Sequence, residues 1–195
     1  MKNLQVQVTE DLSAEPVSVV EAGAWCKVTG STLTAETSIF NILIPAARKA
    51  IEKYTSSSFG EKKISATWLK MPEDWILELP YGPHISIDKV YKIDDEGNET
   101  ELTVNEDYYV TGAQDLSVQV NQFWSTGTVV TWSIRVEYTA GYGDETTEPL
   151  PDDLKLAIMM QVNCDYSFRD VEGATGVLTN AVKAKAAPYR RRTWL

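Results

Sequence analysis

The sequence predicts an α+β protein in which N- and C-terminal helices form a small helical bundle and an antiparallel β lobe is inserted between them. Apolar residues recur at helical spacing before residue 58 and after residue 150. Between about residues 62 and 138 the period is closer to two, and β-branched and aromatic residues dominate, as in strands. Two helices alone seldom bury a core, so the helices from the two ends are expected to pack together.

The expected domain boundaries follow these changes of period. Residues 1–16 are an N-terminal extension, residues 17–58 and 145–188 the helical core, residues 59–144 the inserted β-rich lobe, and residues 189–195 a basic and aromatic C-terminal tail. The chain has 195 residues, 43% of them hydrophobic, which is enough to bury the core of one domain carrying such an insertion.

A short helix is the first expected element, over residues 19–28. Ser18 and Glu21 have the spacing of a capping box at its start. Gly30 is expected to end it, because glycine favours the position just after a helix.

A longer helix is expected over residues 35–54, where apolar residues recur every three or four positions. Pro45 lies inside this helix and is expected to kink it or to split it near Ile44. Residues 94–99 lie between two strand patterns and predict a hairpin turn. The expected strands cover residues 64–69, 75–79, 85–93, 101–104, 108–111, 117–121 and 129–138.

A helix returns after Pro151 and is expected to continue to about residue 168. Asp152 and Asp153 suit its first turn, where negative charge meets the positive end of the helix dipole. Its apolar residues leave no polar face, so the helix needs cover on more than one side, either from a neighbouring subunit or as an internal central helix. The candidate subunit-interface residues on it are Leu156, Met159, Met160 and Tyr166. A last short helix is expected over residues 178–187, ended by Pro188.

The charge of the chain is unevenly distributed. The net charge is -10 and the isoelectric point near 4.6, which argues against nucleic acid as a tightly held ligand. From residue 176 to the end, however, there are five basic residues and no acidic one. An acidic body with a basic tail suits the docking of one subunit on another, although a solvated, frayed terminus explains the same pattern.

The tail is the candidate docking segment for a partner. Three consecutive guanidinium groups offer forked donors to carboxylates, and the aromatic residues beside them are of the kind enriched at binding hot spots. Two alternatives stay open: the tail lies along its own acidic body, or it contacts DNA. The candidate residues are Tyr189, Arg190, Arg191, Arg192, Trp194 and Leu195.

The sequence offers no recognisable catalytic, cofactor-binding or metal site. His84 is the single histidine, and Cys26 and Cys164 fall in expected helices without metal-ligand spacing. The acidic residues 94–99 lack the glycine position and the helical flanks of a calcium-binding EF-hand loop. Residues 141–143, Gly-Tyr-Gly, lack the further glycine or Gly-Lys-Ser/Thr of a phosphate-binding loop.

Membrane and export signals are also missing from the sequence. There is no run of about 18 apolar residues that would span a membrane. The first residues, MKNLQVQVTEDL, contain no continuous apolar stretch of the kind found in a signal peptide. We therefore expect the chain to be made and used in a cytoplasm.

Several stretches carry a resemblance when taken in order. They are Val17–Ala22, Leu43–Thr55, Leu79–Pro80 with Ile87–Val90, Asp107–Val110, Val136–Asp144 followed by Pro151, Tyr166 and Arg169, and Pro188–Arg190. Their order and spacing, over about residues 17–192, resemble the head–tail connector (adaptor) proteins of tailed bacteriophages. Pro45 departs from the pattern of that family, and the segment after Tyr189 is unusually basic.

This resemblance implies a structural virion protein and not an enzyme. Such subunits form a ring with copies of themselves, usually twelve-fold, beneath the capsid portal. The ring extends the DNA channel and is the docking platform for the head-completion (stopper) protein or the tail. The implied partners are thus the chain itself, the portal protein and the downstream head-completion or tail protein, with DNA passing through without specific binding. The implied location is the head–tail interface of the virion, after assembly in the host cytoplasm.

Two other classes of function remain as alternatives. One is a different tail-associated virion module that uses the β-rich lobe as its binding surface. The other is a small hydrolase whose nucleophile the sequence does not reveal.

Overall fold

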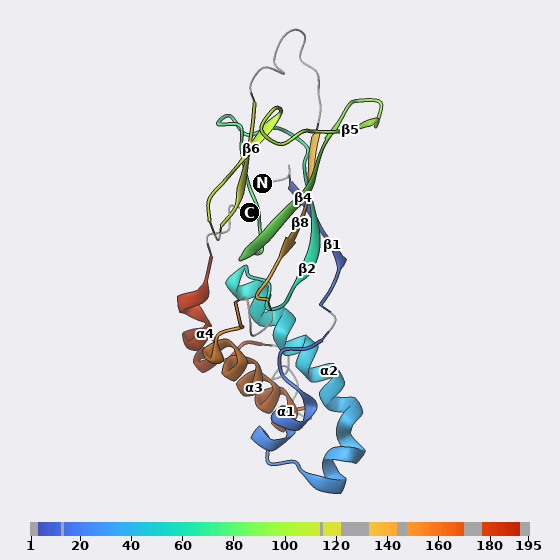
Figure 1. Cartoon of the computed structure of the whole chain (residues 1–195). Coiled ribbons are helices and arrows are strands. Elements are labelled where there is room, and N and C mark those ends of the chain that lie inside the picture. The colour runs from blue at the N-terminus through green and yellow to red at the C-terminus, as the bar shows by residue number, and fades with distance from the viewer. Residues whose placement is uncertain are drawn as a thin grey trace. The chain divides into compact units, whose positions relative to one another are not determined.

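The computed structural model describes residues 4–12, 14–113, 115–121, 133–143, 148–169 and 177–191, and it confirms the α+β class (Figure 1). Among these residues, the chain forms two compact units. The helical unit comprises residues 12–60 and 142–191. The β unit comprises residues 61–141 together with the first strand.

Four helices build the helical unit, two from each end of the sequence. They are α1 (Val19–Trp25), α2 (Gly30–Thr55), α3 (Asp152–Ser167) and α4 (Asn180–Ala186), followed by the 3-10 turn η2 (Ala187–Tyr189). Helix α2 packs against α1 and α3, and α3 packs against α4. One apolar core joins them, including Phe40 and Ile51 of α2, Leu154 and Ile158 of α3, and Val182 of α4. The expected packing of N- and C-terminal helices into one bundle is thus observed.

The start of α1 agrees with the sequence, but its end does not. The Ser18 Oγ accepts the Glu21 N–H, and the Glu21 carboxylate accepts the Ser18 N–H at 2.7 Å, so the capping box is formed. The helix ends at Trp25 and not at residue 28. Lys27 adopts a left-handed conformation, and the Val28 N–H donates to the Gly23 carbonyl, which closes a Schellman motif without glycine.

Helix α2 begins earlier than expected and is not split. Gly30, expected to end the preceding helix, is instead the first residue of α2, and its positive φ makes the turn between the two helices. Pro45 lies within a continuous helix. Its missing N–H leaves the Asn41 carbonyl without its helical donor, and Asn41 is exposed, so water can replace the lost bond.

Two antiparallel sheets form the β unit. The larger has the order β1-β2-β8-β4-β5 and the smaller β3-β7-β6. The core between them takes residues from both sheets, among them Ile64, Val136 and Tyr138 from the larger and Leu77 and Val118 from the smaller. The strands are β1 (Leu4–Glu10), β2 (Lys62–Trp68), β3 (Ile76–Glu78), β4 (His84–Ile93), β5 (Glu99–Glu101), β6 (Tyr108–Thr111), β7 (Ser117–Val120) and β8 (Ser133–Ala140).

Strand β1 lies inside the stretch that the sequence analysis treated as an N-terminal extension. It pairs antiparallel with β2, from Leu4 opposite Trp68 to Val8 opposite Ile64. Its sequence, LQVQVTE, alternates apolar and polar residues, which is the pattern of a half-buried strand. The residues expected as an N-terminal extension thus contain a strand, whose signal was present in the sequence.

The hairpin turn expected at residues 94–99 is present between β4 and β5. The Asp94 carboxylate accepts the N–H groups of Glu96 and Asn98. The strand expected at residues 101–104 instead covers Glu99–Glu101, because the turn is tighter than the acidic run suggested. The last strand ends at Ala140, two residues later than expected, and residues 129–132 lie outside the described part of the chain.

Candidate interaction surfaces

Helix α3 presents one buried side and one half-buried side. Among its buried residues, Leu154, Ala157, Ile158 and Val162 join the core of the helical unit. Leu156, Met159 and Met160 fall on the opposite arc of the helical wheel and are half-buried, and of these Met159 and Met160 also pack partly against the core. The helix is therefore not fully internal within its own subunit, and three of the four candidate interface residues share the arc that a neighbour could cover.

Tyr166, the fourth candidate interface residue, is turned towards α2. Its ring stacks on Phe40 with the ring centroids 5.2 Å apart, and its hydroxyl donates to the Glu36 carboxylate. The Arg169 guanidinium lies 4.6 Å from the centre of the same ring. These contacts assign Tyr166 to the packing of α3 on α2 within one subunit.

The described part of the tail lies against the C-terminal end of α2. Tyr189 packs on the core of the helical unit, and its carbonyl accepts the Ser57 hydroxyl at 3.4 Å. The Arg191 N–H donates to the Thr55 carbonyl at 2.9 Å, and burial lowers the pKa of the Arg191 guanidinium. Arg190 is exposed, with its guanidinium 4.9 Å from the centre of the Tyr54 ring.

These contacts show which candidate docking residues are bound within the subunit. The sequence analysis left open whether the tail docks on a partner or lies along its own body. Tyr189 and Arg191 have partners within the subunit, because the Ser57 hydroxyl and the Thr55 carbonyl at the end of α2 bind them. Arg190 keeps its exposed position, and Arg192, Trp194 and Leu195 lie outside the described residues.

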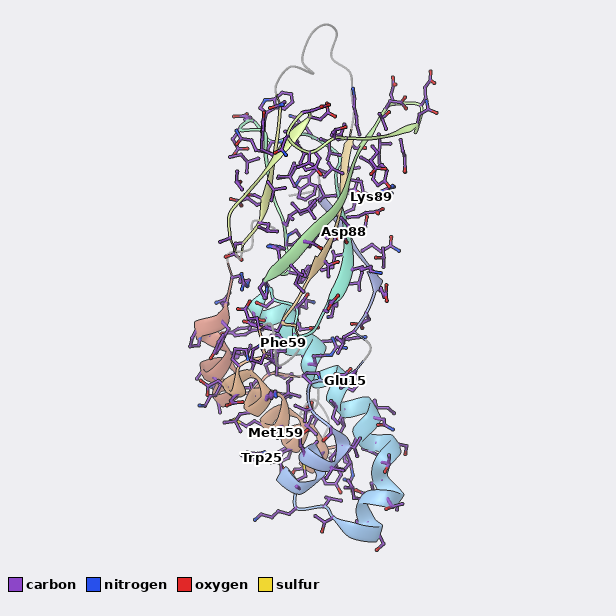
Figure 2. All side chains as sticks on the ribbon, viewed as in Figure 1. Glu15, Trp25, Phe59, Asp88, Lys89 and Met159 are labelled. Atoms are coloured by element: carbon purple, nitrogen blue, oxygen red, sulfur yellow. The ribbon has the colours of Figure 1, made fainter. Side chains whose placement is uncertain are left out.

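A buried charge network near the middle of α2 was missed by sequence reasoning. Arg48 is only 2% exposed, and its guanidinium binds both carboxylate oxygens of Glu15, at 2.8 and 3.1 Å. It also donates to Glu52, one turn along the helix, at 2.9 Å. The other oxygen of Glu52 accepts the Phe59 N–H at 2.7 Å. Figure 2 labels Glu15 and Phe59, two members of this network. Arg48 thus joins the segment before α1, helix α2 and the loop after it.

The sequence contained a usable signal for this network. Arg48 and Glu52 stand four residues apart on the same helix face as Ile44 and Ile51, which are buried. A charged pair on an apolar face is expected to be internal, because a buried charge needs a partner. Glu15 could not be found in this way, since nothing in the sequence relates the segment before α1 to the middle of α2.

His84 serves the packing of the β unit. Its Nδ1 accepts the Leu116 N–H at 3.0 Å, so its Nε2 carries the proton and donates to the Pro80 carbonyl at 3.2 Å. The Tyr138 hydroxyl donates to the same carbonyl at 2.7 Å, and burial raises the pKa of that hydroxyl. Both ring nitrogens of His84 are thus bound by backbone groups of the β unit.

Other chemistry is equally sparse in the described part of the chain. There, no group of three or more His, Cys, Asp or Glu residues is placed to hold a metal ion. Cys26 and Cys164 are half-buried free thiols, and burial raises the pKa of both, which disfavours the reactive thiolate. No described helix is long and apolar enough to cross a membrane.

Comparison by sequence gives no relative: no protein-family model and no curated protein matches the chain. Comparison by structure does find similar proteins. A chain of the neck of an empty gene transfer agent particle, computed with C6 symmetry, superposes with a TM-score of 0.76 and 19% identity over 98% of this chain and 97% of that chain. This chain shares the fold of a particle-neck protein.

Two further structures give the same result. A chain from the virion of a native gene transfer agent particle matches with a TM-score of 0.73 and 18% identity, over 98% of this chain and 97% of that one. A chain from the neck of a native particle computed with C12 symmetry matches with a TM-score of 0.65 and 15% identity, over 97% of both chains. The chain therefore shares its fold with chains from the neck and the virion of gene transfer agent particles.

Proposed function

We propose that this chain is a structural subunit of the neck of a phage-like particle, a head–tail connector that assembles into a ring. The observation that carries the proposal is the end-to-end match with neck chains, over 98% of this chain and 97% of that one in the first case. A match over both the helical unit and the inserted β unit is more specific than a match to either alone. The C6 and C12 symmetry of the similar particles supports a ring of identical copies.

Within that role, we place the ring beneath the portal, where it extends the DNA channel and offers a platform to the head-completion protein or the tail. The net charge of -10 suits a channel that DNA crosses, because an acidic wall does not retain a polyanion. The half-buried arc of α3, with Leu156, Met159 and Met160, is proposed to be covered by the next copy in the ring.

We also propose that the tail docks on the portal. Some of its residues anchor it to the helical unit and the others reach the portal. Tyr189 and Arg191 anchor the segment to the helical unit. Arg190 and the residues that follow it, including Arg192, Trp194 and Leu195, are proposed to reach the portal. The guanidinium groups would pair with carboxylates there, for which their forked geometry is suited.

The proposal is tested by mixing the purified chain with the portal protein of the same particle and weighing the products by native mass spectrometry. A complex with one ring of this chain on each portal is the expected product. A chain that never joins the portal, at any ratio or concentration, contradicts the connector role. If it instead joins a tail component, the tail-associated module is the correct assignment.

A further inference from the structure

The helical unit exposes large apolar side chains on two of its helices, α1 and α2. On α2, Ile42 is 69% exposed, and it falls opposite Phe40 and Ile51 on the helical wheel, so it points away from the core. On α1, Val20 is 68% and Trp25 45% exposed. Single exposed apolar side chains are common on protein surfaces, so these residues are informative only together with the faces around them.

The first face, here called the α2 face, is one stripe along the helix. Its members recur at three- and four-residue spacing, and all of them are exposed. At 1.5 Å per residue the stripe is about 33 Å long, enough for a contact of ordinary size. It consists of Ser31, Ala35, Ser38, Ile42, Ala46, Lys49 and Lys53.

The second face, here called the α1–α3 face, combines two helices that pack on each other. It consists of the exposed Val20 and Trp25 of α1 and the half-buried arc of α3 with Leu156, Met159 and Met160. Figure 2 labels Trp25 of α1 and Met159 of α3, and these two helices contact each other. This face is the more apolar of the two and has the larger side chains.

The charges beside the two faces differ in sign. The α2 face ends in the exposed Lys49 and Lys53 and carries no acidic residue. The α1–α3 face is bordered by the exposed carboxylates of Glu21 and Asp152, with Lys155 offsetting part of the charge on Glu21. Opposite charges at the rim favour one orientation of the contact over others.

We propose that the α1–α3 face of one copy binds the α2 face of the next copy, so that Val20 and Trp25 cover Ile42. This rests on the proposed ring function, because a closed ring of more than two copies needs two different faces on each subunit. The C6 and C12 symmetry of particles with the same fold fits such a head-to-tail contact. A two-fold contact, in which one face meets its own copy, would close at a dimer.

The test uses one glutamate on each face, Val20→Glu and Ile42→Glu, in the full-length chain. Both sites are exposed, so the folded subunit tolerates the change, which circular dichroism and thermal unfolding verify. Sedimentation over a concentration series should show self-association of the unmodified chain, weakened at least about 100-fold in either variant, because each change places a carboxylate in an apolar contact.

Mixing the two variants is the decisive step. Each variant retains the face that the other has lost, so the mixture should form a one-to-one dimer and nothing larger. Val104→Glu serves as the matched control, because Val104 is 48% exposed in the β unit and lies on neither face. It should associate as the unmodified chain does.

Three results overturn the proposal: an unmodified chain that stays monomeric at every concentration, variants that associate normally, or a mixture that remains monomeric. If the unmodified chain forms rings but the variants do not complement each other, the ring function stands and only the choice of faces is wrong. If the chain also fails to form a ring on the portal, the proposed function fails with it.

Discussion

Arg48 shows how much one residue can determine in the helical unit. Its guanidinium sits between two carboxylates and is almost fully buried. Replacing Arg48 by Met removes the positive charge but leaves Glu15 and Glu52 facing each other without it. Breaking a buried ion pair in this way costs about 3–5 kcal/mol, so Arg48→Met should lower the free energy of unfolding by roughly that amount in urea titrations.

The control for this prediction lies on the same helix. Lys53 is exposed on α2, so Lys53→Met should change the free energy of unfolding by less than about 0.5 kcal/mol. Equal effects of the two substitutions would mean that the Arg48 network adds nothing beyond ordinary helix packing. The double variant Arg48→Met, Glu52→Gln should recover part of the loss, because it removes one of the orphaned charges.

At the scale of single elements, the start of α1 gives a pH-dependent prediction. Hydrogen bonds from the Ser18 side chain and backbone hold the pKa of Glu21 below its usual value of 4.5. A carboxyl with a lowered pKa stabilises the fold above its unfolded pKa, and this contribution is lost as the pH falls through the folded pKa. Glu21→Gln should therefore be less stable than the unmodified chain at pH 7, by about 0.5 kcal/mol at this exposed site.

The same comparison at pH 3 provides the contrast, because Glu21 loses this contribution as the pH falls through its lowered folded pKa. The difference between the two chains should therefore be smaller at pH 3 than at pH 7. A difference that is the same at pH 7 and pH 3 would show that the charge of Glu21 is not what stabilises the helix start.

Elements with a strong local signal were predictable from the sequence. The capping box of α1, the long α2, the acidic first turn of α3 and the hairpin turn at Asp94 were all expected and are present. The ends of α1 and β5 were not, because Lys27 takes a left-handed conformation usually reserved for glycine and the turn after β4 is tighter than the acidic run. Strand β1 was missed although its alternation was visible.

The candidate surfaces were less predictable than the elements. The sequence selected α3, and three of its four candidate residues share one half-buried arc. It misplaced Tyr166, whose stacking on Phe40 depends on how α3 crosses α2. It also could not decide between a docking tail and one lying on its own body, because the carbonyl of Thr55 that holds Arg191 is a feature of the folded helix end and not of the tail sequence.

At the scale of the whole molecule, two truncations separate the roles of the tail. Deleting residues 189–195 removes Tyr189 from the core and should lower the thermal midpoint by several degrees. Deleting residues 192–195 keeps the Tyr189 and Arg191 anchors and should leave the midpoint unchanged. Both deletions should abolish joining to the portal in pull-down assays. If the shorter deletion still joins, residues 192–195 are not a docking segment.

Measuring DNA binding by the two truncated chains tests the remaining alternative, in which the tail contacts DNA. Three arginines contacting phosphates would give an affinity that falls steeply with salt and disappears on deletion of residues 189–195, which removes all three. We expect no such loss, because the body of the protein is strongly acidic. A salt-dependent affinity that vanishes with the tail would place DNA, and not the portal, as the partner of the tail.

Membership of a neck ring is the central claim, and imaging the particle tests it most directly. The measurement is a cryo-electron microscopy reconstruction of intact particles that contain this chain, without imposed symmetry at the portal vertex. The account predicts a closed ring of this chain, with cyclic symmetry, between the portal and the tail. Density for the chain in a tail fibre or baseplate, or as isolated copies outside a ring, would contradict it.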